Sequence, residues 1–347
     1  MTKKRIRQMN AALLRRLSLR PAAEYLAGRE ETAVQLVGEG YFQRFAPLMD
    51  RVRAIVGDAV YGVDVSGLPE VCMQFLKERG LTYYAETGFG KGGGGARGLL
   101  SKYPIEETEL INSWMFKGVC NVDGKRIAIY PSHSNYVYYS CYYPRGYNDG
   151  GGNSGWEKLP DGPNTDVSEI LERNALSGRP ESAREFVENA KKELDKGAIV
   201  ILAGDLNEPS HLDWVESTKD MFEHNGCIVP WQTSLLLTES GFIDAFRQMY
   251  PDPATHPGLT WPVNNKGIPV SDLAWAAEAD ERDRIDYIYY YPDSRFSLVD
   301  IKMVGPTGTI VRGERVAADT QEPIIDQAGE HWPSDHRGLL MTIRWNE

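Results

Sequence analysis

The sequence predicts an α/β domain organised around one buried strand at residues 199–202. Four consecutive aliphatic residues stand there before an Ala-Gly pair, which is typical of a strand with apolar contacts on both faces. The preceding segment, 166–196, has apolar residues at helical spacing, so we expect helices there that cover one face of the sheet. A second strand, at 284–290, is aromatic and β-branched but carries one acidic residue in its interior, Asp286.

Length and composition favour one domain. The chain has 347 residues, and no low-complexity stretch divides it, so we predict a basic N-terminal extension at 1–30 and a single domain at 31–347. Residues 1–20 hold seven Lys or Arg and leucines at helical spacing, which favours a surface helix over a nucleic-acid arm. Their apolar run is too short for a secretory signal.

No stretch reaches membrane-spanning length, so we expect a cytoplasmic protein, with secretion as the alternative. No obligate protein partner is evident. The net charge of -11 argues against a large contact with duplex DNA, because phosphate contacts need clustered Lys and Arg. A small phosphate ester is not excluded by this charge.

Further strands are expected at 32–37, 58–65, 99–105 and 126–130, with a helical segment at 42–56. The last of these strands leads to His133. The glycine-rich segment 88–98 is interpreted as a flexible loop and not a phosphate-binding loop, because Lys91 is followed by Gly92 instead of Ser or Thr. A second glycine-rich run, at 148–155, is also predicted to be a loop.

Residues 136–147 contain six tyrosines and one arginine. Two interpretations of this aromatic cluster stay open. It can line a substrate cleft, or it can pack against the sheet or form an exposed hairpin.

Three short motifs carry the chemistry. In Gly-Asp-Leu-Asn at 204–207, Asp205 and Asn207 are two residues apart at a strand end, so both project to the same side. A turn with an Asx cap is the alternative. In Arg-Ile-Asp-Tyr at 284–287, Asp286 needs a partner inside its strand. In Ser-Asp-His at 334–336, Asp335 and His336 are adjacent and precede the apolar run 339–343.

In this order the three motifs resemble the endonuclease/exonuclease/phosphatase superfamily, also called deoxyribonuclease I-like. The segments around 208–214 and 281–287 are similar to one uncharacterised bacterial branch of it. The resemblance implies a four-layer α/β sandwich, with two mixed β-sheets packed face to face and helices on the outside. It also implies a metal-dependent phosphoesterase that uses Mg²⁺ or Mn²⁺.

The resemblance also implies a role for each motif residue. His336, paired with Asp286, would neutralise the phosphoryl oxygens. Asp205 would position or deprotonate the attacking water, and Asn207 would donate to a nonbridging oxygen. His133 would assist at the leaving group. The substrate stays open among small molecules, lipid head groups and nucleic acids, and the acidic charge favours the smaller ones.

The metal ligands implied by the resemblance are Asp335 and Asp64, with Gln35 on the first strand. The superfamily normally has Asn and Glu where this chain has Gln35 and Asp64, and Glu39 or Glu70 could be the ligand instead. These departures leave open a weakened or lost metal site. The alternative function is therefore a catalytically weakened or inactive family member that acts as a binding or scaffold protein.

Overall fold

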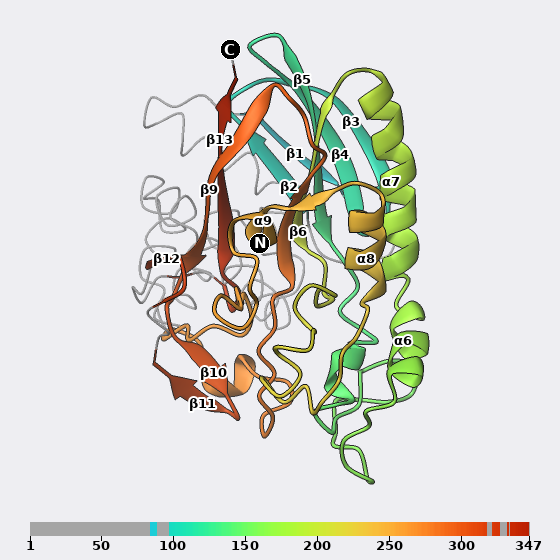
Figure 1. Ribbon diagram of the computed structural model, residues 1–347, viewed down its shortest axis with the longest axis vertical. Coiled ribbons are helices and arrows are strands. Elements are labelled where there is room, and N and C mark those ends of the chain that lie inside the picture. The colour runs from blue at the N-terminus through green and yellow to red at the C-terminus, as the bar shows by residue number, and fades with distance from the viewer. Residues whose placement is uncertain (1–83, 89–96, 318–320, 327–331, 333, 347) are drawn as a thin grey trace, which may run out of the picture. The chain divides into compact units, whose positions relative to one another are not determined.

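A computed structural model of the chain describes residues 84–88, 97–317, 321–326, 332 and 334–346 (Figure 1). These residues fall into two compact units. The smaller contains most of β1 (Tyr84–Gly88) and β2 (Arg97–Ser101), which pair as a two-stranded sheet. Apart from the first residue of β3, the larger unit contains every element described below. The predicted strands at 32–37 and 58–65, the helical segment at 42–56 and the boundary at residue 30 lie outside the described residues.

The larger unit is built on a mixed six-stranded sheet in the order β3-β4-β5-β6-β8-β7. Its strands are β3 (Ile105–Asn112), β4 (Met115–Val122), β5 (Lys125–His133), β6 (Ile199–Asp205), β7 (Ile243–Asp244) and β8 (Asp286–Tyr290). The predicted buried strand at 199–202 is confirmed as β6, which pairs parallel with β5 and antiparallel with β8. The strand predicted at 99–105 is wrong as one element, because a turn in which the Tyr103 amide donates to the Ser101 hydroxyl separates β2 from β3.

The parallel connection from β5 to β6 contains two helices, α6 (Val167–Ala175) and α7 (Arg179–Asp195). Asp166 caps α6 by accepting hydrogen bonds from the backbone amides of Ser168 and Glu169. The helical pattern at 166–196 breaks at Gly178, whose φ of 77° is left-handed, before Pro180 opens the next helix. Only the second of the two helices contributes to the cluster that covers the sheet.

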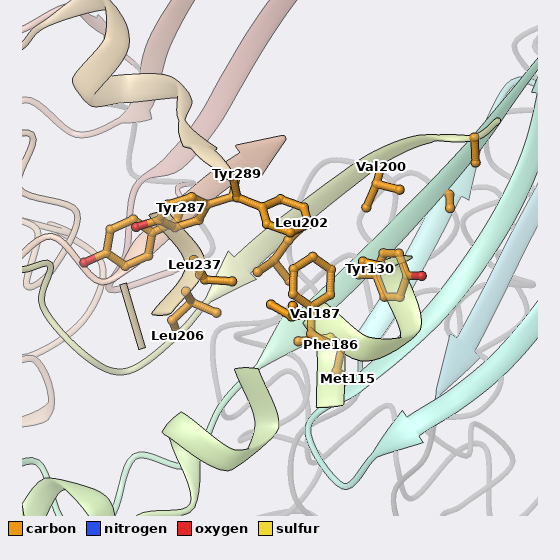
Figure 2. Packing of buried hydrophobic residues seen from close by; sticks show 14 of the residues in the cluster. Met115, Tyr130, Phe186, Val187, Val200, Leu202, Leu206, Leu237, Tyr287 and Tyr289 are labelled. Carbon is orange, nitrogen blue, oxygen red and sulfur yellow. The ribbon is translucent and has the colours of Figure 1, made fainter. Parts of the chain in front are cut away.

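One face of the six-stranded sheet is covered by α7 and α8 (Gln232–Glu239). Figure 2 shows Phe186 and Val187 of α7 and Leu237 of α8 packed against residues of β5, β6 and β8. Tyr130, Val200, Leu202, Tyr287 and Tyr289 supply the sheet side of this cluster. Alternate residues of each strand therefore face these helices, as a two-residue strand period requires.

The opposite face of this sheet packs on a three-stranded sheet, β12-β9-β13. Its strands are β9 (Phe296–Gly305), β12 (Ile324–Asp326) and β13 (Gly338–Trp345). Burial alternates along β13, and its half-buried residues Leu339, Met341 and Ile343 join a core with Ile127 and Ile199 of the larger sheet. Two mixed sheets thus pack face to face with helices outside, which confirms the predicted α/β sandwich.

The remaining described elements are short. They are η3 (Ser140–Tyr142), α9 (Ala245–Met249), η4 (Val270–Asp272) and the hairpin of β10 (Thr309–Val311) and β11 (Glu314–Val316). Long loops join these elements beyond the ends of β5, β6 and β8 (Figure 1). Among the described helices, none is both long enough and apolar enough to cross a membrane.

Candidate functional site

The sheet register places three of the predicted site residues in one row. His133 at the end of β5 pairs with Asp205 at the end of β6, and Asp205 pairs with Asp286 at the start of β8. His133 Nε2 lies 3.7 Å from Asp205 Oδ2. Because β8 runs antiparallel to the other two strands, its first residue meets their last residues at the same edge.

Gly204 allows β6 to approach β5 at this edge. Its φ is 139°, and a Cβ built on it would lie 2.0 Å from the carbonyl oxygen of Ser132. No other residue type fits that contact without moving the backbone, so the glycine that precedes Asp205 is a structural requirement of the site.

Asp205 and Asn207 form a tight turn that is also part of the site. Asn207 has a left-handed φ of 48°, and its backbone amide donates to Asp205 Oδ1 at 2.7 Å. Asn207 Nδ2 donates to Asp205 Oδ2 and to the Ser134 carbonyl, each at 3.0 Å. The Asx turn expected as the alternative for this motif is therefore present, and both amide hydrogens of Asn207 are engaged.

His336 contacts the carboxylate at the other end of the row. Its Nδ1 lies 2.9 Å from Asp286 Oδ2. Burial alone lowers the pKa of His336, but the charge and hydrogen bond of Asp286 outweigh it, and the pKa rises to about 10. The ring is therefore an imidazolium at neutral pH, with Nδ1–H donating to Asp286.

The pKa of Asp205 moves in a direction that suits proton transfer. Burial, followed by repulsion from the Asp286 carboxylate, raises the pKa of Asp205 to about 7. His336 partly opposes this rise. Asp205 is therefore protonated more readily near neutral pH than an ordinary aspartate.

Asp335 is held by residues that sequence reasoning missed. Its Oδ2 accepts a hydrogen bond of 3.1 Å from Trp261 Nε1, and its carbonyl accepts one from the Val263 amide. The buried Arg337 next to this motif donates to the carbonyls of Leu259, Pro306, Thr307 and Gly308. In the sequence, the features that could have indicated these supporting residues are the Thr-Trp-Pro segment at 260–262 and the arginine that follows His336.

Thr260 supports the start of β8. Its hydroxyl oxygen accepts the backbone amides of Ile285 and Asp286 at 3.1 and 3.2 Å. The loop that positions Asp335 through Trp261 therefore also positions Asp286, so one segment orients residues from two motifs.

A pocket of about 160 Å³ opens over this row. His133, Asp205, Asn207, Asp335 and His336 line it together with aromatic residues, and Asp286 contacts His336. The structure thus brings together six of the eight predicted site residues. Gln35 and Asp64, and the alternatives Glu39 and Glu70, lie outside the described residues.

The donor chemistry of the pocket fits a hard divalent cation. Three carboxylates, of Asp205, Asp286 and Asp335, interact electrostatically there, and carboxylate oxygens are the ligands that Mg²⁺ and Mn²⁺ prefer. Asp205, Asp286 and His336 also place ligand atoms within 4.8 Å of one another. Within this trio His336 pairs with Asp286, and Asp335 adds a further carboxylate to the same pocket.

Residues 34–336 match the Endonuclease/Exonuclease/phosphatase family. The chain belongs to this family. The three motifs on which the resemblance was based all lie within the matched region, and the predicted superfamily is confirmed. The endonuclease/exonuclease/phosphatase family comprises divalent-metal-dependent hydrolases of phosphate esters. The assignment to a bacterial branch stays a prediction.

Among curated proteins, the chain is 40% identical over 92 residues to "Uncharacterized protein F14F9.5" of Caenorhabditis elegans. That match covers 26% of this chain and 27% of the worm protein, so the chain aligns with only about a quarter of its relative's length.

Three solved structures illustrate the similarity to known proteins. An endonuclease/exonuclease/phosphatase from Beutenbergia cavernae DSM 12333 has 14% identity and a TM-score of 0.40, over 80% of this chain and 57% of that chain. The 3' phosphatase NExo from Neisseria, bound to a product DNA hairpin, has 14% identity and a TM-score of 0.42, over 79% and 83%. TDP2 of D. rerio, complexed with a single-strand DNA product, has 16% identity and a TM-score of 0.38, over 80% and 82%.

Proposed function

We propose that this chain hydrolyses a phosphate monoester or diester by means of an activated water and a bound divalent cation. The observation that supports this proposal most directly is the row of His133, Asp205 and Asp286, with His336 in contact, beside one pocket. This arrangement puts the cationic His336, the Asp205 carboxylate with its pKa near neutrality and the neighbouring Asp286 carboxylate in one place.

The imidazolium of His336 neutralises charge on the phosphoryl oxygens. Asp286 keeps it protonated across the neutral range, because the ion pair raises the pKa of His336 to about 10. A group that stays charged through the reaction stabilises developing negative charge without giving up its proton.

Asp205 accepts the proton of the attacking water. Its pKa of about 7 matches the requirement that a general base titrate near the operating pH. Asn207 holds Asp205 through two hydrogen bonds, and it donates to a phosphoryl oxygen by exchanging the Nδ2 bond that it makes to Asp205. His133, near Asp205, assists at the leaving group.

Asp335 would hold Mg²⁺ or Mn²⁺, together with Asp64 and Gln35 or with Glu39 or Glu70. When bound, the cation offsets negative charge on the phosphate and on the leaving oxygen. Trp261 fixes one oxygen of Asp335, which sets the direction in which the other oxygen projects.

The test is hydrolysis of bis-p-nitrophenyl phosphate and p-nitrophenyl phosphate with Mg²⁺ or Mn²⁺. We expect turnover by the wild type and a loss of about 10²–10⁴ in kcat for Asp205→Ala and His336→Ala. His256→Ala is a matched control, because this histidine does not line the pocket. The preferred ester distinguishes a diesterase from a monoesterase.

Inactivity of the wild type with every metal and ester would refute the proposal and favour the binding or scaffold alternative. A second measurement separates a lost metal site from a wrong substrate. A functional metal site predicts that Mg²⁺ raises the unfolding temperature and that Asp335→Ala removes this effect. A protein without a metal site unfolds identically with Mg²⁺ and with EDTA.

A further inference from the structure

Three aromatic side chains form a wall of the same pocket, and we call Tyr136, Trp156 and Trp275 the aromatic wall. Their ring centroids lie 5.2 to 6.4 Å apart, so the rings contact one another. Tyr136 is 55% exposed and Trp275 is 51% exposed, although both are large apolar side chains beside a pocket. Exposed aromatic surface in a concave site is a mark of ligand binding.

The backbone that carries Tyr136 is rigid. The buried Arg179 donates to the carbonyls of Asn135, Val137 and Tyr138 at 2.7 to 3.1 Å. Asn135 also closes an Asx turn by accepting the amide of Val137 at 3.0 Å. The exposed ring of Tyr136 is therefore presented from a fixed main chain, unlike an aromatic residue on a loose hairpin.

Trp156 depends on the glycine-rich run at 148–155. Gly150 has a left-handed φ of 70°, and a Cβ there would lie 2.3 Å from the Trp156 ring. Tyr142 packs edge-on against the same ring, with centroids 5.8 Å apart. The glycine at 150 thus allows the Trp156 ring to lie directly against the loop backbone.

Trp275 is anchored through the buried carboxylate of Glu281. Glu281 Oε2 accepts the backbone amides of Trp275 and Ala276 at 3.1 and 2.9 Å, and it also accepts the Tyr142 hydroxyl at 2.5 Å. One buried acid therefore fixes both the Trp275 backbone and the ring that supports Trp156. All three parts of the aromatic wall are pre-organised.

We infer that the aromatic wall stacks against a flat ring carried by the substrate, an aryl group or an unpaired nucleobase attached to the phosphate. This inference rests on the proposed phosphoesterase function, because the wall and the catalytic row line one pocket. A base inside a duplex is not available for such stacking.

The packing of the wall also favours a flat ring over a quaternary ammonium group. A cation cage needs aromatic faces that are separated by the cation, within about 6 Å of each centroid. Here the rings touch one another, so they offer a continuous surface and not an enclosed box.

Binding of two non-hydrolysable probes tests the inference. Phenylphosphonate and methylphosphonate share a head group and differ in the ring, and calorimetry with Mg²⁺ gives both affinities without any turnover. We expect the wild type to bind phenylphosphonate roughly 5- to 150-fold more tightly than methylphosphonate. This is the gain in affinity expected from stacking one base on an aromatic side chain. Tyr136→Ala and Trp275→Ala should reduce this ratio toward one and leave methylphosphonate unaffected.

Two variants control for loss of folding. Trp275→Phe keeps a ring and should retain most of the preference, and Leu176→Ala removes an exposed apolar residue that does not line the pocket. Uridine 5′-phosphate against ribose 5-phosphate, in Asp205→Asn so that neither is hydrolysed, distinguishes a nucleobase from a simple aryl group. A base effect as large as the phenyl effect assigns the wall to nucleotides.

Equal affinity for the two phosphonates, no binding of phenylphosphonate, or a preference for choline phosphate would overturn the inference. Turnover of esters without a ring preference would overturn it and leave the proposed function standing. A ring preference that Trp275→Ala removes, in a protein that hydrolyses no ester, would support the wall as a ring site and refute the proposed function.

Discussion

Asp286→Asn is the most informative single substitution at the site. It keeps the size and shape of the side chain and removes the charge that lies 2.9 Å from His336 Nδ1. The backbone amide of this residue still donates to Thr260, so β8 should start at the same place. Any change in His336 then reports the lost charge and not a displaced strand.

The size of the effect follows from the pKa of His336. A value of about 10 against an ordinary 6.5 corresponds to a preference for the imidazolium on the order of 5 kcal/mol. Burial opposes this preference, and Asp286 is the largest contribution in its favour. Without the Asp286 charge, we expect the pKa of His336 to fall well below its wild-type value, because burial lowers it and the largest opposing contribution is lost.

The same shift determines how stability depends on pH. The pKa of His336 is higher in the folded protein than in the unfolded chain, so its stabilising contribution is complete below pH 6.5 and is lost as pH rises through about 10. Asp286→Asn should therefore lower the free energy of unfolding at pH 6 by about 3 kcal/mol, and this difference should shrink toward pH 10.

Three measurements check this prediction. Imidazole NMR of metal-free protein follows six histidines, and the His336 signal is the one that His336→Ala removes. Urea unfolding at pH 6 and pH 10 gives the stability difference. Hydrolysis at neutral pH should fall by about 10²–10⁴ in kcat, as expected when a charged catalytic group is lost.

Two results would refute the reasoning. Titration of His336 near 6.5 in the wild type would show that the Asp286 pair does not control it. An unchanged alkaline limb of the rate profile in Asp286→Asn would show that the imidazolium is not the form that acts.

Three further substitutions probe the neighbouring residues. Asp205→Asn should be inactive. At pH 8 in EDTA it should also be more stable than the wild type by on the order of 3 kcal/mol in urea unfolding, because the stability of the wild type falls as pH rises from 3.8 through the raised Asp205 pKa of about 7. Equal stability of the two proteins would contradict this. Trp261→Phe removes the donor to Asp335 and should weaken Mg²⁺ binding about 10- to 100-fold by calorimetry, while unchanged affinity would place the cation elsewhere. Gly204→Ala should lower the urea-unfolding free energy by about 3 kcal/mol or more, since its Cβ would meet the Ser132 carbonyl at 2.0 Å; wild-type stability would show that β5 and β6 can separate freely.

The central strand and the three motifs could be predicted because each is a local signal. The aliphatic run of β6 and the polar residues at its end are consecutive in sequence, and their period determines which side they face. The row of His133, Asp205 and Asp286 could not be derived from the residues in the same way. It depends on the sheet order β5-β6-β8, which joins segments that are distant in the sequence.

The aromatic cluster shows why a pattern alone left two interpretations open. Tyr139, Tyr142, Tyr143 and Tyr147 are buried in one core with Trp214, whereas Tyr136 is exposed beside the pocket. Tyr139 and Tyr142 also line the pocket, so this run contributes both to a buried core and to the pocket, and its contact with a substrate stays a prediction. Trp156 and Trp275 gave no sequence signal, because they lie on loops with no periodicity and their ring contact joins segments that are distant in the sequence.

The placement of arginine explains how an acidic chain can present a phosphate site. The buried Arg145, Arg179 and Arg284 form ion pairs with Asp283, Glu208 and Asp213, respectively. Arg337 is buried among backbone carbonyls. These cations hold the loops around the pocket, and the described residues that line it include no Lys or Arg.

Among the described residues that line the pocket, attraction for a phosphate would come from His336, and under the proposed function also from the bound cation. Both act at the reacting group and neither extends along a nucleic-acid backbone, where binding depends on many Lys and Arg contacts. The described residues that line the pocket do not supply the many cationic contacts that a long duplex needs, whereas a small ester needs only the phosphate contact and the aromatic wall. Under the proposed function, this division between structural arginines and a histidine in the pocket favours substrates recognised by one phosphate and one adjoining group.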